Sequence, residues 1–175
     1  DDLYSYEEYT DVRIIIPNSD SYNPYSIEDN DNIYEDDPPL FGDDFDFGNI
    51  TSLTIEGEGN GSVKLIAPPN IKHFAVNNSE LSLKLKNLTL TYNDEDDDED
   101  EDNTKCGGVD VIDGNVTFDK VTFDHLDNSS GNTNDGAVNI SGGTVNFTNK
   151  TTFTSCKSEN GGAVNISGGN VSFDS

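Results

Sequence analysis

Gly136-Ala-Val-Asn-Ile-Ser-Gly-Gly-Thr-Val-Asn-Phe147 is the stretch that decides the fold, because it returns almost unchanged as Gly162-Ala-Val-Asn-Ile-Ser-Gly-Gly-Asn-Val-Ser-Phe173, 26 residues later. A looser copy runs from Gly108 to Phe118. Apolar and polar residues alternate inside each copy, and this period is typical of β-strands. Self-similarity at a spacing of about 20 to 50 residues indicates stacked repeats. We therefore predict two or three short strands per copy, separated by tight turns.

One strand–turn–strand circuit per copy predicts an all-β fold, a parallel β-helix. This is a single-stranded solenoid of pectin-lyase-like architecture, with an N-terminal cap and about four to five coils. We assign residues 49–175 to the coils, with 94–102 as an acidic loop insertion, and residues 1–48 to an acidic cap or leader. The strand Val12–Ile16 is the centre of the expected cap, together with Leu40, Phe41, Phe45 and Phe47. The last copy stops in mid-repeat at Ser175, so we expect a fragment of a longer exported protein.

The residues shared by the copies are the candidate structural positions of the repeat. Glycine supplies positive φ angles and close backbone approach at corners, while aromatic residues at matching positions are expected to stack inside. The glycines are Gly107, Gly108, Gly136, Gly161 and Gly162, and the aromatic residues are Phe118, Phe147, Phe153 and Phe173.

The charge of the chain is strongly acidic and unevenly distributed. It has 35 acidic and 9 basic residues, a net charge of −26, and nine consecutive acids at Asp94–Asp102. Such a chain repels nucleic acid and anionic membrane surfaces, so we exclude both as partners. No run of 18 apolar residues occurs, and we expect no insertion of this chain into a membrane.

Metal binding is expected to be weak, and no other cofactor is expected. The acidic run offers hard oxygen ligands for Ca²⁺ but lacks the spacing of a known calcium loop. Its candidate ligands are Asp94, Asp96, Asp98, Asp100 and Asp102. His73 and His125 have no second ligand nearby in the sequence, and each is expected to be structural or solvent-facing.

Two further residue types bear on the environment of the protein. Eleven Asn-X-Ser/Thr triplets occur, and glycosylation of some is expected in a host that glycosylates. Their asparagines are Asn49, Asn60, Asn77, Asn87, Asn115, Asn128, Asn139, Asn146, Asn149, Asn165 and Asn170. Cys106 and Cys156 are too few for a disulfide framework, and we expect free or buried thiols.

Catalysis is not expected. The lysines are scattered along the coils, whereas a polysaccharide lyase needs a convergent basic group. A glycoside hydrolase needs two carboxyl groups about 5 to 10 Å apart on one face. Asp110, Asp113, Asp119 and Asp124 are the candidates. Asp110 aligns with Asn139 and Asn165 in the later copies, which indicates an outward row of polar residues rather than a catalytic acid.

The later copies resemble a known family. Gly-Gly-Ala-Val at 161–164, preceded by Phe-Thr-Ser-Cys-Lys-Ser-Glu-Asn at 153–160, resembles the Gly-Gly-Ala-Ile and Phe-x-x-Asn repeats of the chlamydial polymorphic outer-membrane proteins. The match covers about residues 106–175, and Gly107-Gly108-Val109 departs from it by lacking the alanine. The resemblance implies a right-handed β-helical passenger, displayed at the cell surface and used in adhesion. In that family a C-terminal β-barrel, outside this sequence, translocates the passenger.

The repeat and the resemblance together favour an adhesin-like function. We expect a chain at the cell surface or outside the cell, on the outer membrane if the source is bacterial. Its expected partner is a receptor or glycan on a host or neighbouring cell. Two alternatives stay open: a polysaccharide lyase or hydrolase of the pectin-lyase-like class, and a purely structural spacer of the cell envelope.

Overall fold

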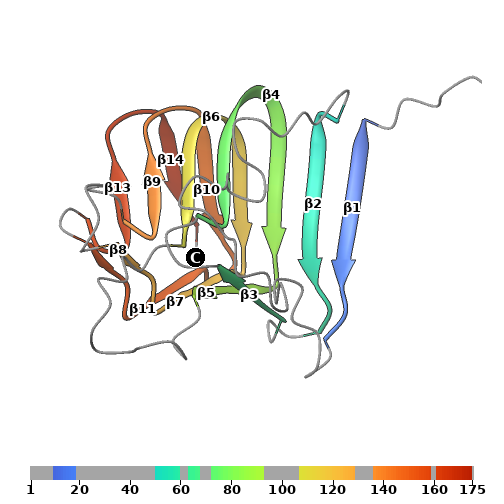
Figure 1. Ribbon diagram of the computed structural model, residues 1–175. Coiled ribbons are helices and arrows are strands. Elements are labelled where there is room, and N and C mark those ends of the chain that lie inside the picture. Colours follow the sequence, from blue (N-terminus) through green and yellow to red (C-terminus); the bar gives the residue numbers. More distant parts are fainter. Residues whose placement is uncertain are drawn as a thin grey trace, which may run out of the picture.

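The computed structural model describes residues 10–18, 50–59, 63–67, 72–92, 107–128, 136–158 and 161–174, and these residues form strands and turns without a helix (Figure 1). The predicted alternation of apolar and polar residues is confirmed by the strands. They are β1 (Asp11–Ile16), β2 (Ser52–Gly57), β3 (Val63–Ala67), β4 (Phe74–Lys86), β5 (Leu88–Tyr92), β6 (Val109–Asp119), β7 (Thr122–Asp124), β8 (Asp127–Asn128), β9 (Val138–Ile140), β10 (Thr144–Thr148), β11 (Thr152–Thr154), β12 (Lys157–Ser158), β13 (Val164–Ile166) and β14 (Asn170–Phe173).

The strands make three sheets, and every strand pair is parallel. The largest has eight strands in the order β1-β2-β4-β6-β10-β14, with β9 between β6 and β13. A second sheet has the order β11-β7-β5-β3, and β12 pairs with β8 in a third. Figure 1 shows the eight-stranded sheet standing upright above the four-stranded sheet.

The predicted fold, a right-handed parallel β-helix of four to five coils, is wrong. The described residues lie in three separately hydrogen-bonded sheets, and they contain no closed coil. Short strands separated by a tight turn are predicted for the copy from Gly108 to Phe118, yet this copy forms the continuous strand β6, and Gly114 lies inside it. Its φ of 95° lets the strand change which side chains face inward without leaving the sheet. The all-β class and the parallel direction of the strands remain correct.

The register of the repeat copies follows the sequence alignment. Val145 pairs with Val116 on one side and with Val171 on the other. Phe147 is paired in the same way, so its ring stacks on Phe118 at 5.1 Å and on Phe173 at 4.7 Å. The predicted stack of aromatic side chains is therefore present under the eight-stranded sheet.

A second aromatic stack joins the two larger sheets. Phe153 lies 4.7 Å from Phe123, at an angle of 6°, under the four-stranded sheet. Phe123 meets the edge of Phe118 at 5.2 Å, so the two stacks touch. Phe118, Phe123 and Leu90 are fully buried. Burial of such a side chain stabilises the fold by about 1.5 to 3 kcal/mol each.

Glycine is required where successive copies approach closely. A Cβ atom on Gly142 would lie 2.2 Å from the carbonyl oxygen of Ile112, and one on Gly168 would lie 2.3 Å from that of Ser141. These are steric clashes with backbone, which cannot turn away as a side chain can. Each Gly-Gly pair therefore depends on the copy that precedes it.

The N-terminal assignments are met in part. The strand predicted at Val12–Ile16 is present as β1, but it pairs with β2 as a member of the eight-stranded sheet. The apolar residues predicted to complete the cap, Leu40, Phe41, Phe45 and Phe47, lie outside the described residues. The same holds for Cys106 and for the acidic run Asp94–Asp102, which contains all five calcium candidates.

Candidate functional site

The outer face of the eight-stranded sheet, the side turned away from the core, carries rows of polar residues in register. Over β10, β14 and residues 115–117 of β6, these residues are uncharged and exposed or half-buried. We call them the amide–hydroxyl patch: Asn115, Thr117, Thr144, Asn146, Asn170 and Ser172. Ser172 Oγ donates to Asn146 Oδ1 at 2.6 Å, so the patch is tied together across the strands. The regular strand spacing makes it a rigid array of hydrogen-bonding groups.

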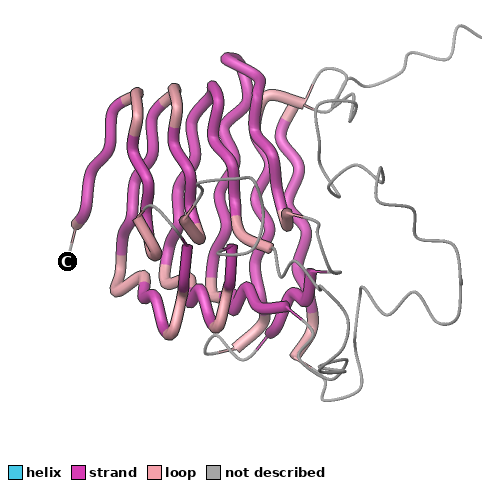
Figure 2. The backbone as a smooth tube through the Cα atoms, turned by 60° about the vertical axis from the view of Figure 1, so that its left-hand side comes forward, coloured by secondary structure: helices cyan, strands magenta, loops and turns pink. Residues whose placement is uncertain are grey.

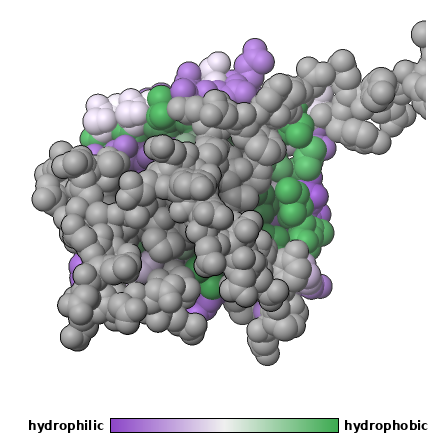
Figure 3. Space-filling model, in the orientation of Figure 1, coloured by the Kyte–Doolittle hydropathy of each residue, from purple (hydrophilic) through white to green (hydrophobic). Residues whose placement is uncertain are grey.

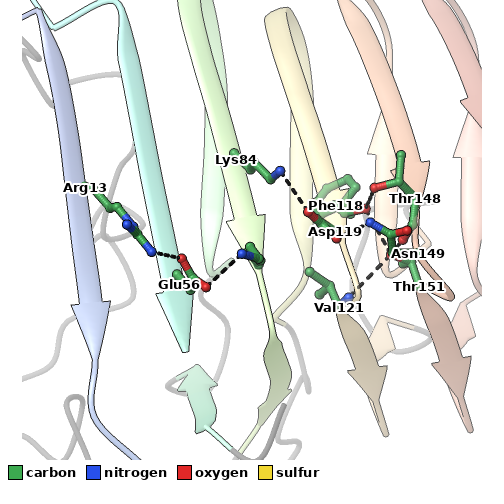
Figure 4. A network of polar contacts seen from close by, with 10 residues as sticks. Arg13, Glu56, Lys84, Phe118, Asp119, Val121, Thr148, Asn149 and Thr151 are labelled. Carbon is green, nitrogen blue, oxygen red and sulfur yellow. Dashed lines mark hydrogen bonds and ion pairs between the residues drawn. The ribbon is translucent and has the colours of Figure 1, made fainter. Parts of the chain in front are cut away.

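Over β1, β2 and β4 the outer face is charged instead (Figure 4). Glu56 lies between Arg13 and Lys86, and its carboxylate forms an ion pair with each. The hydrogen bond from Lys86, at 2.9 Å, and then the one from Arg13 hold the pKa of Glu56 below its ordinary value. The carboxylate therefore stays ionised, and its charge is matched by two bases.

Asp119 forms a second charged cluster at the end of β6 (Figure 4). Lys84 Nζ lies 2.8 Å from one carboxylate oxygen, and Asn149 Nδ2 donates to the other at 2.7 Å. Burial alone would raise the pKa of Asp119, but the hydrogen bonds from Lys84 and Asn149 outweigh it and lower that pKa. With one oxygen on a lysine and the other on an amide, Asp119 is not poised to donate a proton.

The turn after β10 positions Asn149. Asn149 and Lys150 both have positive φ angles, 50° and 62°, and asparagine tolerates this conformation better than most residues. Thr151 Oγ1 then donates to the carbonyl of Phe118 at 3.0 Å, and Thr148 Oγ1 donates to the same carbonyl at 3.2 Å. These bonds fasten the turn to the preceding copy and hold the Asn149 amide against Asp119.

The four carboxylates considered for hydrolysis are not brought together. Asp110 pairs with Asn139 of β9, whereas Asp119 ends β6 and bonds Asn149 in the turn after β10. Asp113 accepts a hydrogen bond from the backbone N–H of Gly114, and Asp124 contacts His125 in the four-stranded sheet. The prediction that Asp110 aligns with Asn139 and Asn165 is confirmed by the register.

The basic residues are less scattered than the sequence indicated. The ladder β1-β2-β4 brings Arg13, Lys84 and Lys86 to one end of the outer face, where acids accompany all three. The alternation of Thr54-Ile55-Glu56 and Lys84-Leu85-Lys86 could have shown that these charges face outward. Their register could not be read from the sequence, because β1, β2 and β4 are not copies of the repeat.

His73 is a structural residue of the core, not a ligand. The backbone N–H of Gly108 donates to its Nδ1 at 2.8 Å, so Nε2 carries the proton. Nε2 lies 3.0 Å from the carbonyl of Leu65 in β3 and 2.9 Å from that of Thr91 in β5. Burial lowers the pKa of His73 to about 4, and the ring is neutral at neutral pH. It joins two strands of the four-stranded sheet to the start of β6.

The remaining candidates are placed as follows. His125 is exposed beside Asp124, with 2.8 Å between Nδ1 and Oδ1. Cys156 is free, as predicted, and burial raises the pKa of its thiol. Among the sequon asparagines, Asn165 Nδ2 donates to Asn139 Oδ1 at 3.0 Å, so this pair forms part of the outer row.

The described residues contain neither a cluster of metal ligands nor a membrane-spanning helix. In the seven described ranges, no group of three or more His, Cys, Asp or Glu side chains is placed to hold a metal ion. The same part of the chain has no helix that is long and apolar enough to cross a membrane.

Comparison with known proteins adds no relative. No family model matches the chain, and neither a curated protein nor a solved structure matches it.

Proposed function

We propose that this chain is a non-catalytic adhesin-like module at the cell surface, which attaches to a glycan or receptor on a host or neighbouring cell. The observation that carries the proposal is the amide–hydroxyl patch. Its asparagine amides and threonine and serine hydroxyls both donate and accept hydrogen bonds, as the hydroxyl groups of neutral sugars do. The patch spans three strands in register, so it would present these groups without ordering a loop first.

The charges of the outer face support binding over catalysis. Glu56 and Asp119, the acids with lowered pKa values, are ionised and bridged by bases. A glycoside hydrolase needs one carboxyl group that stays protonated to act as the acid. Arg13, Lys84 and Lys86 are each paired with one of these acids, which disfavours a lyase that binds an acidic sugar.

The test is a glycan and cell-surface binding screen. It compares the intact chain, a chain without residues 94–102, and the double variant Thr117→Ala/Asn146→Ala, each with Ca²⁺ and with chelator. We expect saturable binding that survives the deletion and the chelator but falls at least about tenfold in the double variant. The matched control is Asn77→Ala/Ser79→Ala, which likewise removes one amide and one hydroxyl group, in an exposed part of β4 outside the patch.

Each other result selects an alternative. Binding lost with residues 94–102 or with the chelator would assign attachment to the acidic run. Turnover of an acidic polysaccharide would overturn the non-catalytic proposal in favour of a lyase. No saturable binding in any condition would favour the structural spacer.

A further inference from the structure

One row of outward side chains crosses five strands of the eight-stranded sheet without carrying a charge. We call it the cross-strand row, and its members are Ser52 in β2, Ser82 in β4, Asn115 in β6, Thr144 in β10 and Asn170 in β14. Each member is the direct backbone partner of the next, so the row crosses the strands as one line. Figure 2 shows the strands of this sheet side by side. Ser52 and Ser82 extend the row beyond the amide–hydroxyl patch, to which the other three members belong.

The side chains of this row have hydrogen-bonding capacity that the fold does not use. Three of the five are exposed and two are half-buried. Within the described ranges, no hydrogen bond joins any of these side chains to another residue. The neighbouring row differs, because there Ser172 donates to Asn146, and Lys84 pairs with Asp119. The cross-strand row can therefore bond a ligand without first breaking a bond of the protein.

The spacing of the row fits a linear chain of sugars. Adjacent strands lie about 4.8 Å apart, so the five strands of the row span about 19 Å. A pyranose residue in an extended β-1,4-linked chain has a length close to this strand spacing. The row therefore has room for about four sugars, each opposite one or two side chains. Amide and hydroxyl groups can both donate to and accept from the hydroxyl groups of such sugars.

Charge limits the ligand to an uncharged glycan. The row itself is uncharged, although the chain has a net charge of −26. At its β1 end the row meets Asp11, which is exposed and is the backbone partner of Ser52. This acidic side chain disfavours a negatively charged sugar. Strand β1 also exposes apolar surface, with Ile14 41% and Ile15 55% exposed (Figure 3). The polar row thus ends at β2.

We propose that the cross-strand row is a binding track for a linear, uncharged, β-1,4-linked glycan that lies across the strands. The inference rests on the proposed function, and it narrows the ligand from glycans and receptors in general to this class. Binding comes from several hydrogen bonds along the track rather than from one pocket. Each of these bonds contributes modestly, so affinity rises with each added sugar until the track is full.

Titration calorimetry with oligosaccharides of two to six sugars tests the length of the track. The probes are the β-1,4-linked series of glucose, N-acetylglucosamine and mannose. In at least one series the affinity should rise up to about the tetrasaccharide and then level off. The α-1,4-linked glucose series, whose chains coil, should bind more weakly at every length. The proposal is wrong if affinity does not depend on length, if the coiled series binds as well, or if none of the three β-linked series binds.

Substitutions outside the patch separate this proposal from the proposed function. Ser52→Ala/Ser82→Ala should weaken binding of the tetrasaccharide on the order of tenfold, and should change binding of the disaccharide, which fits on the patch alone, much less. The matched control is Thr152→Ala/Thr154→Ala, which removes two exposed hydroxyl groups from β11 in the four-stranded sheet and should leave binding unchanged. Thermal unfolding of each variant checks that the fold survives.

The two proposals fail in different ways. Tetrasaccharide binding that is unchanged in Ser52→Ala/Ser82→Ala but lost in Thr117→Ala/Asn146→Ala would overturn the track and keep the patch as the attachment site. Binding that survives in both double variants would overturn the track and the patch together.

Discussion

Two nearly identical stretches, Gly136–Phe147 and Gly162–Phe173, fold alike but have different environments. The first lies between β6 and the last copy, and its Ile140 and Phe147 are almost completely buried. The second is the last copy, and the matching Ile166 and Phe173 are about half exposed. Their strands have the same parallel register. The sequence of a copy thus sets its local conformation, whereas its burial, and with it the stability it contributes, is set by neighbours.

The largest test of this comparison is truncation of the paired aromatic residues. Phe147→Ala should lower the free energy of unfolding by about 4 kcal/mol, because it leaves a cavity between two stacked rings. Phe173→Ala should lower it by about 1 kcal/mol or less, because that side chain is mostly exposed. Urea unfolding at concentrations where the chain is monomeric measures both. Equal losses would contradict the comparison.

The buried His73 and the exposed His125 should differ in how they make the stability of the fold depend on pH. The pKa of His73 falls from an ordinary 6.5 to about 4 in the folded chain, so between these values only the unfolded chain takes up a proton. The free energy of unfolding should therefore reach its full value above pH 6.5. It should fall by about 3 kcal/mol as the pH drops toward 4. The lowered pKa values of Glu56 and Asp119 add losses of the same sign at lower pH.

Denaturant unfolding at pH values from 7.5 to 4.5 would measure this dependence of the free energy of unfolding on pH. His73→Gln should remove most of the pH dependence, while His125→Gln, at an exposed position, should keep it. A His73→Gln chain with the full pH dependence would show that other groups are responsible.

The glycine pair sharpens the comparison, because here the two copies should behave alike. Gly142→Ala and Gly168→Ala should each cost about 2 kcal/mol, since the added Cβ atom would meet a backbone carbonyl of the preceding copy at 2.2 or 2.3 Å. In both copies the clash lies on the side that faces the preceding copy, and that side is covered in each case. A much smaller loss for Gly168→Ala would mean that the last copy is held loosely, and hydrogen exchange of β14 would measure that directly.

The smallest effect concerns the charged half of the outer face. Asp119→Asn should lower the free energy of unfolding by about 1 kcal/mol, because it weakens charge-assisted hydrogen bonds that solvent partly screens. The loss should shrink in high salt. Asp113→Asn, whose carboxylate bonds its own neighbour Gly114, is the control, and it should change stability less.

The repeat made part of this fold predictable from the sequence. Alternation located the strands, and the spacing of the copies predicted that Val116, Val145 and Val171 would be partners. The error was to interpret each strand–turn–strand copy as one closed coil, whereas in the copy from Gly108 to Phe118 the glycine at the expected turn, Gly114, lies inside β6. A glycine at positive φ either ends a strand or shifts its inward face within a continuous strand, and the local sequence is the same in both cases.

The candidate site was predictable only where it repeats. The row from Asp110 through Asn139 to Asn165 followed from aligning the copies. The pairing of Glu56 with Lys86 did not, because β2 and β4 share no repeat that would set their register. His73 was expected to be either structural or solvent-facing, and the sequence could not choose between the two, since its three backbone partners come from segments far apart in the sequence.

Three contacts join the last described copy, Gly162–Phe173, to the copy before it. Gly168 meets Ser141, Asn165 bonds Asn139, and Ser172 bonds Asn146. A further copy would therefore need only the residues that contact the copy before it, and the copies already present would need no change to pair with it. Tandem duplication of the 26-residue unit would in one step supply a segment that already satisfies its neighbour.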